Sequence, residues 1–231
     1  MDLVIILLVG FPVIQAVSTI QTDVCHPCFP GHTGTREWNF DGPADDTSVT
    51  SLMRHFVDRV NDVKEKVTTA IEQVVDNNYD GDVGYLCQLR MAGESDIPST
   101  HSSSLSQVNP LTKTYNQVAT LSLYFQILNW DFIKNCGLDF THLIGTPPVC
   151  YWKQVLRHFR HRVPGQFCRK TFPIDGVTSC STAVDLAYVI LESSRGILAT
   201  LDSQVSIYKS ILENSNSENE AMQIILDSRI M

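Results

Sequence analysis

The sequence predicts an all-α fold, a secreted and disulfide-stabilised bundle of about four long helices. Three observations support this fold class. Apolar residues recur every three or four positions in four long segments, no segment alternates as a strand would, and all seven cysteines follow a leader-like start. Apolar residues make up 43% of the 231-residue chain, which is enough for a core. We divide the chain into a signal peptide (1–18), a cysteine-containing arm (19–44), a helical domain (45–213) and a polar C-terminal tail (214–231).

The amino-terminal residues have the features of a secretory signal peptide. Leu3 to Ile14 form an apolar run of about 12 residues, which is too short to anchor the chain in a bilayer. Ala16 and Ser18 place small residues at the spacing that favours cleavage after Ser18. The start departs from the usual pattern because it carries Asp2 and no Lys or Arg. We therefore expect a soluble, extracellular mature protein with no membrane span.

The cysteines predict disulfide bonds, because thiols pair outside the cell. An odd number leaves one of them either free or joined to a second chain, so a disulfide-linked dimer is an open alternative. Their spacing does not reveal the connectivity. The seven are Cys25, Cys28, Cys87, Cys136, Cys150, Cys168 and Cys180.

The formal net charge of −8 argues against nucleic acid as the main partner, because phosphates repel an acidic surface. It is compatible with cation binding. The sequence also lacks the nucleophile-elbow, zinc-protease and nucleotide-binding motifs. We therefore expect a non-catalytic protein.

The first helix is predicted from Asp45 to about Asn77. Asp45, Asp46, Thr47 and Ser48 offer capping side chains at its start. The apolar stripe that predicts this helix consists of Val49, Leu52, Met53, Phe56, Val57, Val60, Val63, Val67, Ala70, Ile71, Val74 and Val75.

Three further long helices follow a Ser-rich linker over residues 93–110. Their apolar spacing predicts helices over 111–133, 147–163 and 181–212. Gly196 is expected to kink or weaken the last of these helices. A shorter helix is expected from Ala221 within the polar tail.

Residues 74–91, "VVDNNYDGDVGYLCQLRM", place oxygen-bearing side chains at alternate positions just after the first helix. Calcium takes six to eight oxygen ligands, and a loop that curls around the ion presents them at such positions. Gly81 permits the sharp turn that such a loop needs. The candidate ligands are Asp76, Asn78, Asp80 and the backbone carbonyl of Asp82.

This segment resembles the EF-hand calcium loop, D-x-[DN]-x-[DN]-G with an apolar residue at position 8, here Val83. The resemblance covers only this short part of the chain and implies a weak or vestigial Ca²⁺ site. Cys87 stands at position 12, where the family has a bidentate Glu. The alternative is a polar helix terminus, because Asp, Asn and Gly also gather there for capping and turns.

EF-hands work in pairs, so the resemblance implies a second loop. The best candidate, "DFIKNCGLDFTHL", starts at Asp131, with Cys136 in place of the glycine and His142 in place of the Glu. We expect it to hold no metal but to act as a structural partner, with Leu138 against Val83.

A basic cluster on the third helix is a candidate partner-binding surface in this acidic chain. The alternative is an ordinary solvated face. The cluster consists of Lys153, Arg157, Arg160 and Arg162.

Two functions remain open. The first is a secreted, non-catalytic, EF-hand-like protein with a structural or binding role, and the calcium-loop residues favour it. The second is an extracellular signalling protein that binds a receptor. The long–short–long order of the helix connections is that of an up-up-down-down bundle and resembles the layout of the long-chain helical cytokines.

Overall fold

The computed structural model of the chain describes residues 19–22, 48–79, 110–144, 148–159, 170–173, 177–215 and 217–227. These residues are mostly helical, as the sequence predicts. The helices are α1 (Val49–Asn78), α3 (Pro110–Leu128), α4 (Asp131–Asn135), α5 (Thr141–Ile144), α6 (Pro148–His158), α7 (Cys180–Asn214) and α8 (Glu218–Asp227). The predicted signal peptide and most of the predicted arm lie outside the described residues.

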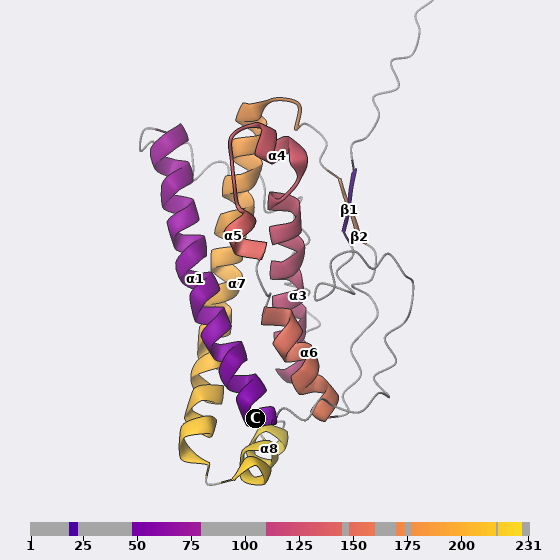
Figure 1. Cartoon of the computed structure of the whole chain (residues 1–231), viewed down its shortest axis with the longest axis vertical. Helices are drawn as coiled ribbons and strands as arrows, with labels where there is room; N and C mark the ends of the chain where they lie inside the picture. The colour runs from indigo at the N-terminus through magenta and orange to yellow at the C-terminus, as the bar shows by residue number, and fades with distance from the viewer. Residues whose placement is uncertain are drawn as a thin grey trace, which may run out of the picture.

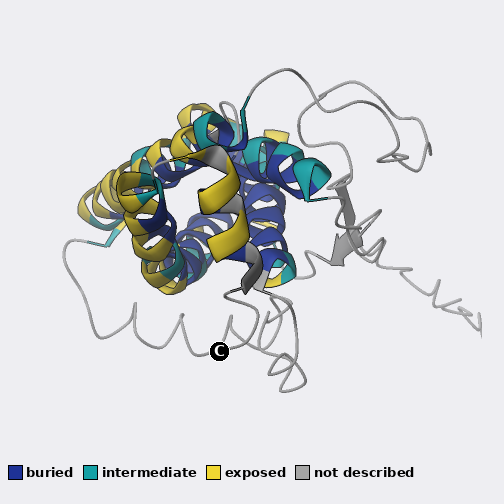
Figure 2. Cartoon of the chain, turned by 90° about the horizontal axis from the view of Figure 1, so that it is seen from below, coloured by how far each residue is buried: buried dark blue, intermediate teal, exposed yellow. Residues whose placement is uncertain are grey.

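The longer helices α1, α3, α6 and α7 lie side by side (Figure 1). α1 packs against α6 and α7, and α3 packs against the same two helices, so α1 and α3 lie diagonally across a common interior. Figure 2 shows the buried faces of the helices turned toward this interior. α8 packs against α7 and the neighbouring end of α1, where its Ala221 and Ile225 are buried.

Contacts along the helices determine their directions. Lys64 of α1 pairs with Asp202 of α7, whereas Tyr79, just beyond the end of α1, bonds to Asp185 near the start of α7. α1 and α7 are therefore antiparallel.

α3 is antiparallel to α7 as well. Its Thr114 bonds to Gln204, and its Gln117, one turn further on, bonds to the earlier residue Thr200. α1 and α3 therefore run in the same direction, which is upward in Figure 1, whereas α6 and α7 run downward.

α1 forms where the sequence supplies both an apolar stripe and an N-cap residue. Every residue predicted for the stripe is buried except Val75, which is half-buried. Ser48 is the N-cap, and its hydroxyl accepts a hydrogen bond of 3.2 Å from the backbone N–H of Ser51. The helix ends one residue later than predicted, at Asn78.

Trp152 lies in α6 and contacts each of the other three long helices. Its fully buried ring lies tilted against Phe56 of α1 at 4.6 Å and against Tyr208 of α7 at 5.0 Å between ring centroids. Its indole N–H donates a 2.9 Å hydrogen bond to the carbonyl of Leu111 in α3. An aromatic side chain of this size buries about 150–250 Å². Trp152 is therefore a major contributor to the core.

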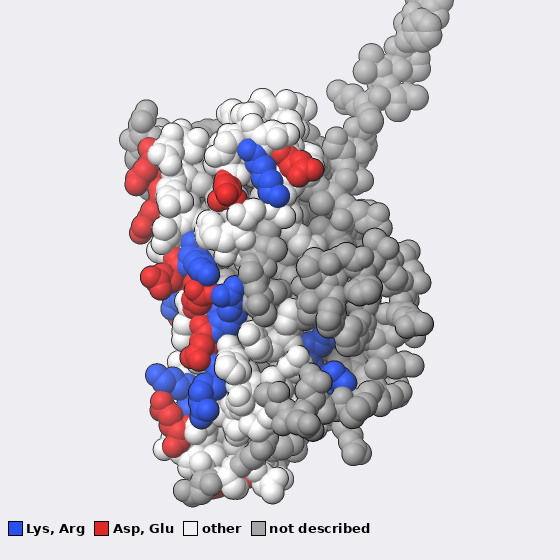
Figure 3. Space-filling view, viewed as in Figure 1, with Lys and Arg blue, Asp and Glu red and all other residues white. Residues whose placement is uncertain are grey.

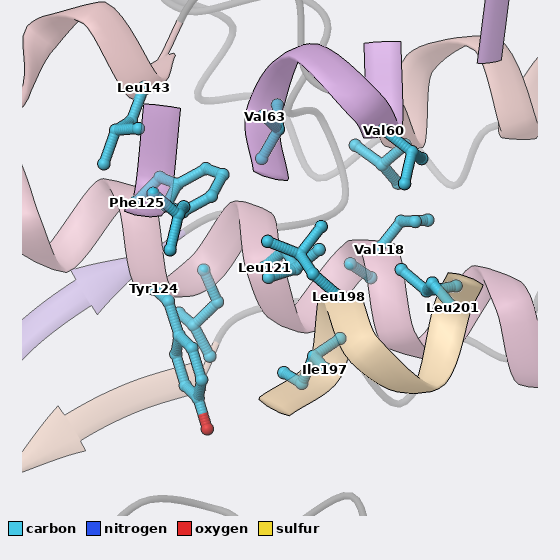
Figure 4. Packing of buried hydrophobic residues seen from close by; sticks show 14 of the residues in the cluster. Val60, Val63, Val118, Leu121, Tyr124, Phe125, Leu143, Ile197, Leu198 and Leu201 are labelled. Carbon is cyan, nitrogen blue, oxygen red and sulfur yellow. The ribbon is translucent and has the colours of Figure 1, made fainter. Parts of the chain in front are cut away.

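Aliphatic side chains fill the rest of the interior. Figure 4 shows Val60 of α1, Leu121 of α3 and Leu198 of α7 converging there, and all three are buried. The apolar residues whose spacing predicts α7 are likewise all buried: Ala183, Ala187, Ile190, Leu191, Ile197, Leu198, Leu201, Val205, Tyr208 and Ile211. α7 continues without a break through the exposed Gly196, where the sequence led us to expect a kink or weakness.

The second predicted helix ends early. α3 stops at Leu128, and a break at Asn129 and Trp130 separates it from the short α4, whereas the sequence predicted one helix to residue 133. α3 is also buried on most of its sides, including the polar residues Thr114, Gln117, Thr120 and Ser122. Apolar periodicity describes the inward face but does not reveal that polar residues are enclosed as well.

A short strand pair accompanies the helices. β1 (Thr19–Thr22) pairs antiparallel with β2 (Lys170–Pro173), with Thr19 opposite Pro173. Strands of four residues with no apolar alternation carry no periodic signal in the sequence. The pair links the predicted amino-terminal arm to the connection between α6 and α7.

One described disulfide joins Cys136, just after α4, to Cys180, the first residue of α7. The two residues are 44 positions apart in the sequence, and closing a loop of that length stabilises a fold by about 4 kcal/mol. Cys150 in α6 is also disulfide-bonded, and it is buried. The other cysteines lie outside the described residues, so the prediction of an odd cysteine stays a prediction.

None of the helices in the described ranges is both long enough and apolar enough to cross a bilayer.

Candidate functional site

The predicted calcium loop begins inside α1. Asp76 and Asn78 lie in the last turn of the helix, where both are exposed, and Asp80 and Asp82 lie outside the described residues. Side chains two positions apart on a helix point away from each other. Asp76 and Asn78 therefore do not converge on one point in this conformation.

Asn78 already has a local role. Its side-chain N–H donates a 3.0 Å hydrogen bond to the carbonyl of Val74, one turn earlier. Calcium binding in the manner of an EF-hand would require this last turn to unwind. The calcium site stays a prediction, and calcium binding there would have to offset the free energy of unwinding this turn.

Tyr79, the fourth position of the predicted loop, anchors the end of α1 to α7. Its hydroxyl donates a 2.7 Å hydrogen bond to the Asp185 carboxylate, and its ring meets Tyr188 edge-on at 5.9 Å. No sequence pattern indicated this contact, because the partners are more than 100 positions apart. Tyr79 limits how far the start of the loop can rearrange.

The second predicted loop is a helical turn followed by a disulfide. Asp131 lies in the first turn of α4, and Cys136 is bonded to Cys180. Gly137 follows with φ of 83°, the left-handed conformation that glycine adopts most easily. Leu138 is half-buried against the core, and its expected partner Val83 lies outside the described residues.

Asp139 in the same segment acts as a local cap. Its carboxylate accepts hydrogen bonds from the side chain of Thr141 at 2.7 Å and from the backbone N–H of Thr141 at 2.9 Å. These bonds hold the pKa of Asp139 below its usual value. Within the described ranges, no three His, Cys, Asp or Glu side chains are grouped closely enough to hold a metal ion.

The predicted basic cluster is only partly accessible. Lys153 is buried in α6, and Arg157 is half-buried. Both already take part in interactions within the chain. Arg160 and Arg162 lie outside the described residues, so partner binding through this cluster stays a prediction.

The outer faces of α1 and α7 form a long charged surface. Side chains of both signs alternate along this side of the molecule (Figure 3). Lys64 pairs with Asp202 across the two helices, and Asp62 pairs with both Arg59 and Lys66 within α1. Exposed ion pairs contribute little to stability, so these pairs add little to the free energy of folding.

A groove of about 250 Å³ lies on this surface between the first turns of α1 and the last turns of α7. Val57 and Leu212 form its apolar part. Its charged rim consists of Arg54, Asp58, Lys209 and Glu213. The rim carries equal numbers of cations and anions, so it does not select a partner of one charge.

No protein-family model, curated protein or solved structure matches this chain.

Proposed function

We propose that the chain is a secreted, non-catalytic signalling protein that acts by binding an extracellular receptor. In this proposal α1, α3, α6 and α7 form an up-up-down-down four-helix bundle with the layout of the long-chain helical cytokines. The observation that carries the proposal is the direction of the helices, with α1 and α3 both antiparallel to α7.

These directions require long connections. α1 ends at the opposite end of the molecule from the start of α3, and 31 residues separate the two helices in the sequence. α6 likewise ends at the opposite end of the molecule from the start of α7, and 21 residues separate these two helices. A bundle of alternating direction needs only short loops, so two long crossovers distinguish the cytokine-like layout.

The exposed faces of α1 and α7 supply what a receptor-binding protein needs. They are long, they lie next to each other, and a packed core fixes their spacing. Rigid elements present a binding surface with little loss of conformational entropy on association.

The helix directions can be tested by distance measurement. We would attach genetically encoded spin labels at Asn77 and Gln126, and at Asn77 and Lys113. Gln126 and Lys113 lie about 20 Å apart along α3, so a parallel α1 and α3 makes the first pair the shorter one. A shorter distance for the second pair contradicts the proposed bundle.

Receptor binding can be tested on cells. Labelled protein beginning at residue 19, with its disulfides intact, should bind saturably to some cell type from the source organism. Unlabelled protein should compete, and protease treatment of the cells should abolish binding. Reduced and alkylated protein is the matched control, because it has the same composition without the native fold. Binding that never saturates, or that the control matches, argues against a receptor.

A weak calcium site at Asp76, Asn78, Asp80 and Asp82 is the second candidate. One observation favours it: Asp76 is exposed in the last turn of α1, which contains no basic residue, and the carbonyl end of a helix attracts cations. Extracellular calcium modules often bind at about 10⁻⁴–10⁻³ M. Calorimetric titration should show calcium binding in this range that Asp76→Ala combined with Asp80→Ala abolishes. No heat at millimolar calcium removes this candidate.

A further inference from the structure

We propose that the groove between the first turns of α1 and the last turns of α7 is a dimer contact, which binds the same face of a second copy of this chain. The groove lies on the charged side of the molecule (Figure 3). The proposal does not depend on receptor binding or on calcium, and it needs no disulfide between the two copies.

The charges on the rim of the groove are little used within the chain. Arg54 and Asp58 are exposed, and neither forms an ion pair with any residue in the described ranges. Lys209 and Glu213 are each 64% exposed and lie 3.9 Å apart, so their pairing is loose. By contrast, Asp62 further along α1 already pairs with two cations of its own helix. The rim charges can therefore pair with a partner.

The register between α1 and α7 places opposite charges across the groove. Lys64 of α1 pairs with Asp202 of α7, and the two helices are antiparallel. Asp58 lies six residues before Lys64, which is about 9 Å along α1. Lys209 lies seven residues after Asp202, which is about 10 Å along α7 in the same direction. Asp58 and Lys209 therefore lie at the same level on opposite sides of the groove.

The signs are exchanged one turn closer to the start of α1. Arg54 lies four residues before Asp58, and Glu213 lies four residues after Lys209, so these two also share a level. Here the positive charge is on α1 and the negative charge is on α7. The four rim charges therefore alternate in sign around the groove.

An alternating pattern of this kind is complementary to itself. A second copy can be turned face to face about a two-fold axis parallel to the helices, so that its α1 lies over α7 of the first copy. Arg54 then meets Glu213 of the partner subunit, and Asp58 meets the partner subunit's Lys209. A two-fold axis across the helices instead brings Arg54 onto the partner subunit's Asp58. Lys209 then meets Glu213 of the partner subunit, so each rim charge meets an opposite charge about either axis.

A second copy is also the partner that this pattern specifies. A balanced rim attracts neither an acidic nor a basic surface, because neighbouring charges of opposite sign cancel at a distance. Two copies of a chain with a formal charge of −8 repel each other at long range, so the association depends on short-range pairing.

The contact has an apolar centre and a small area. Val57 and Leu212 form the apolar part of the groove, and the methylene stems of Arg54 and Lys209 can cover such a surface while their charges reach across. Two neighbouring helices are about 20 Å wide together, and ten residues span about 15 Å, so the contact is well below the roughly 800 Å² that each partner buries in a stable complex. We therefore expect a weak, reversible dimer that leaves the second half of α1 exposed.

Sedimentation equilibrium of the oxidised protein tests for this dimer. Free thiols are first blocked with iodoacetamide, so that copies cannot become linked by a disulfide. Reversible dimerisation should appear between about 10 μM and about 1 mM protein. A chain that remains monomeric throughout this range overturns the proposal.

Two charge-reversal variants test where the copies meet. Arg54→Glu with Lys209→Glu makes all four rim charges negative, and Asp58→Lys with Glu213→Lys makes all four positive. Each variant alone should raise the Kd of the dimer at least about tenfold, because like charges then meet about either axis. An equimolar mixture of the two should associate at least as tightly as the unsubstituted protein, which also shows that both variants are folded. Unchanged self-association of either variant, or a mixture that does not associate, overturns the proposal.

A third variant controls for overall charge. The two rim variants shift the formal charge of −8 by four units in opposite directions, so both stay acidic and net charge does not draw them together. Thr69→Lys with Glu72→Lys and Gln73→Lys shifts the charge by four units at exposed positions in the second half of α1. This control should dimerise with the Kd of the unsubstituted protein. Loss of dimerisation in the control would show that net charge governs the association and would overturn the proposed contact.

Discussion

At the scale of single residues, Trp152 has the largest predicted effect on stability. It contacts three other helices through two ring contacts and one hydrogen bond, and it is fully buried. Trp152→Ala should lower the free energy of unfolding by about 3–5 kcal/mol, because it leaves a cavity in the core and removes the hydrogen bond to Leu111.

Urea unfolding with the disulfides intact measures this loss. Trp130→Phe is the control. Trp130 is only half-buried beside α4, so this substitution should lower the free energy of unfolding much less. A loss below about 1 kcal/mol in Trp152→Ala would contradict the packing described for the core.

Two buried polar residues on α3 should differ in how much their substitution lowers stability. Thr114 bonds to Gln204 and lies 3.2 Å from the Tyr208 hydroxyl, so Thr114→Val removes these bonds and should cost about 1–3 kcal/mol. Gln117 is 7% exposed, and its side-chain carbonyl has no hydrogen-bond partner among the described residues. Gln117→Leu loses the bond to Thr200 but also removes this buried, unpartnered carbonyl, so it should change stability by less than about 1 kcal/mol in either direction. Equal losses in the two variants, measured by urea unfolding, would show that Gln117 is satisfied in solution.

At the scale of elements, the N-cap of α1 is open to a simple test. Ser48 accepts the hydrogen bond from Ser51, so Ser48→Ala should lower the free energy of unfolding by about 0.5–2 kcal/mol. Thr69→Ala is the control, because Thr69 is exposed in the middle of the same helix, where alanine is favourable. Thermal unfolding compares the two. An unfolding temperature of Ser48→Ala equal to that of the unsubstituted protein would mean that the cap contributes nothing to stability.

The elements also show where sequence reasoning succeeds. The stripes of α1 and α7 agree with the buried residues almost without exception, because a long helix with one buried face repeats its signal over many turns. The break after Leu128 was not predicted, because the apolar residues Ile133 and Phe132 continue the spacing across it. The pairing of β1 with β2 joins segments far apart in the sequence, so no local pattern could indicate it.

At the scale of the whole molecule, alkaline pH should destabilise the fold. Burial raises the pKa of Tyr115, Tyr124 and Tyr208 to about 12, from an ordinary value of 10.0. In the unfolded chain these phenols lose their protons near pH 10, whereas in the folded protein they keep them to about pH 12. The unfolded state therefore binds fewer protons in this window, and stability should fall as pH rises from 10 to 12.

Spectrophotometric titration checks this expectation. Phenolate absorbance from these three tyrosines should appear only near pH 12 or together with unfolding, as followed by circular dichroism. Complete ionisation at pH 10.5 in protein that is still folded would contradict their burial.

The candidate sites were predictable to different degrees. The sequence identified the oxygen-bearing residues after the first helix, but it did not indicate that α1 extends through Asn78 or that Tyr79 bonds to Asp185. It grouped Lys153 with Arg157, Arg160 and Arg162 as one basic cluster, whereas Lys153 is buried. Composition identifies which residues can bind a ligand, but only packing decides which of them a ligand can reach.

By itself, the sequence determined that this protein is mostly helical and which residues of its long helices face inward, because helical periodicity is a local property of the chain. Tertiary structure alone decided the helix directions, the pairing of Cys136 with Cys180 and the enclosure of α3. These features depend on contacts between residues 40 to more than 100 positions apart, and such contacts form only when the whole core assembles.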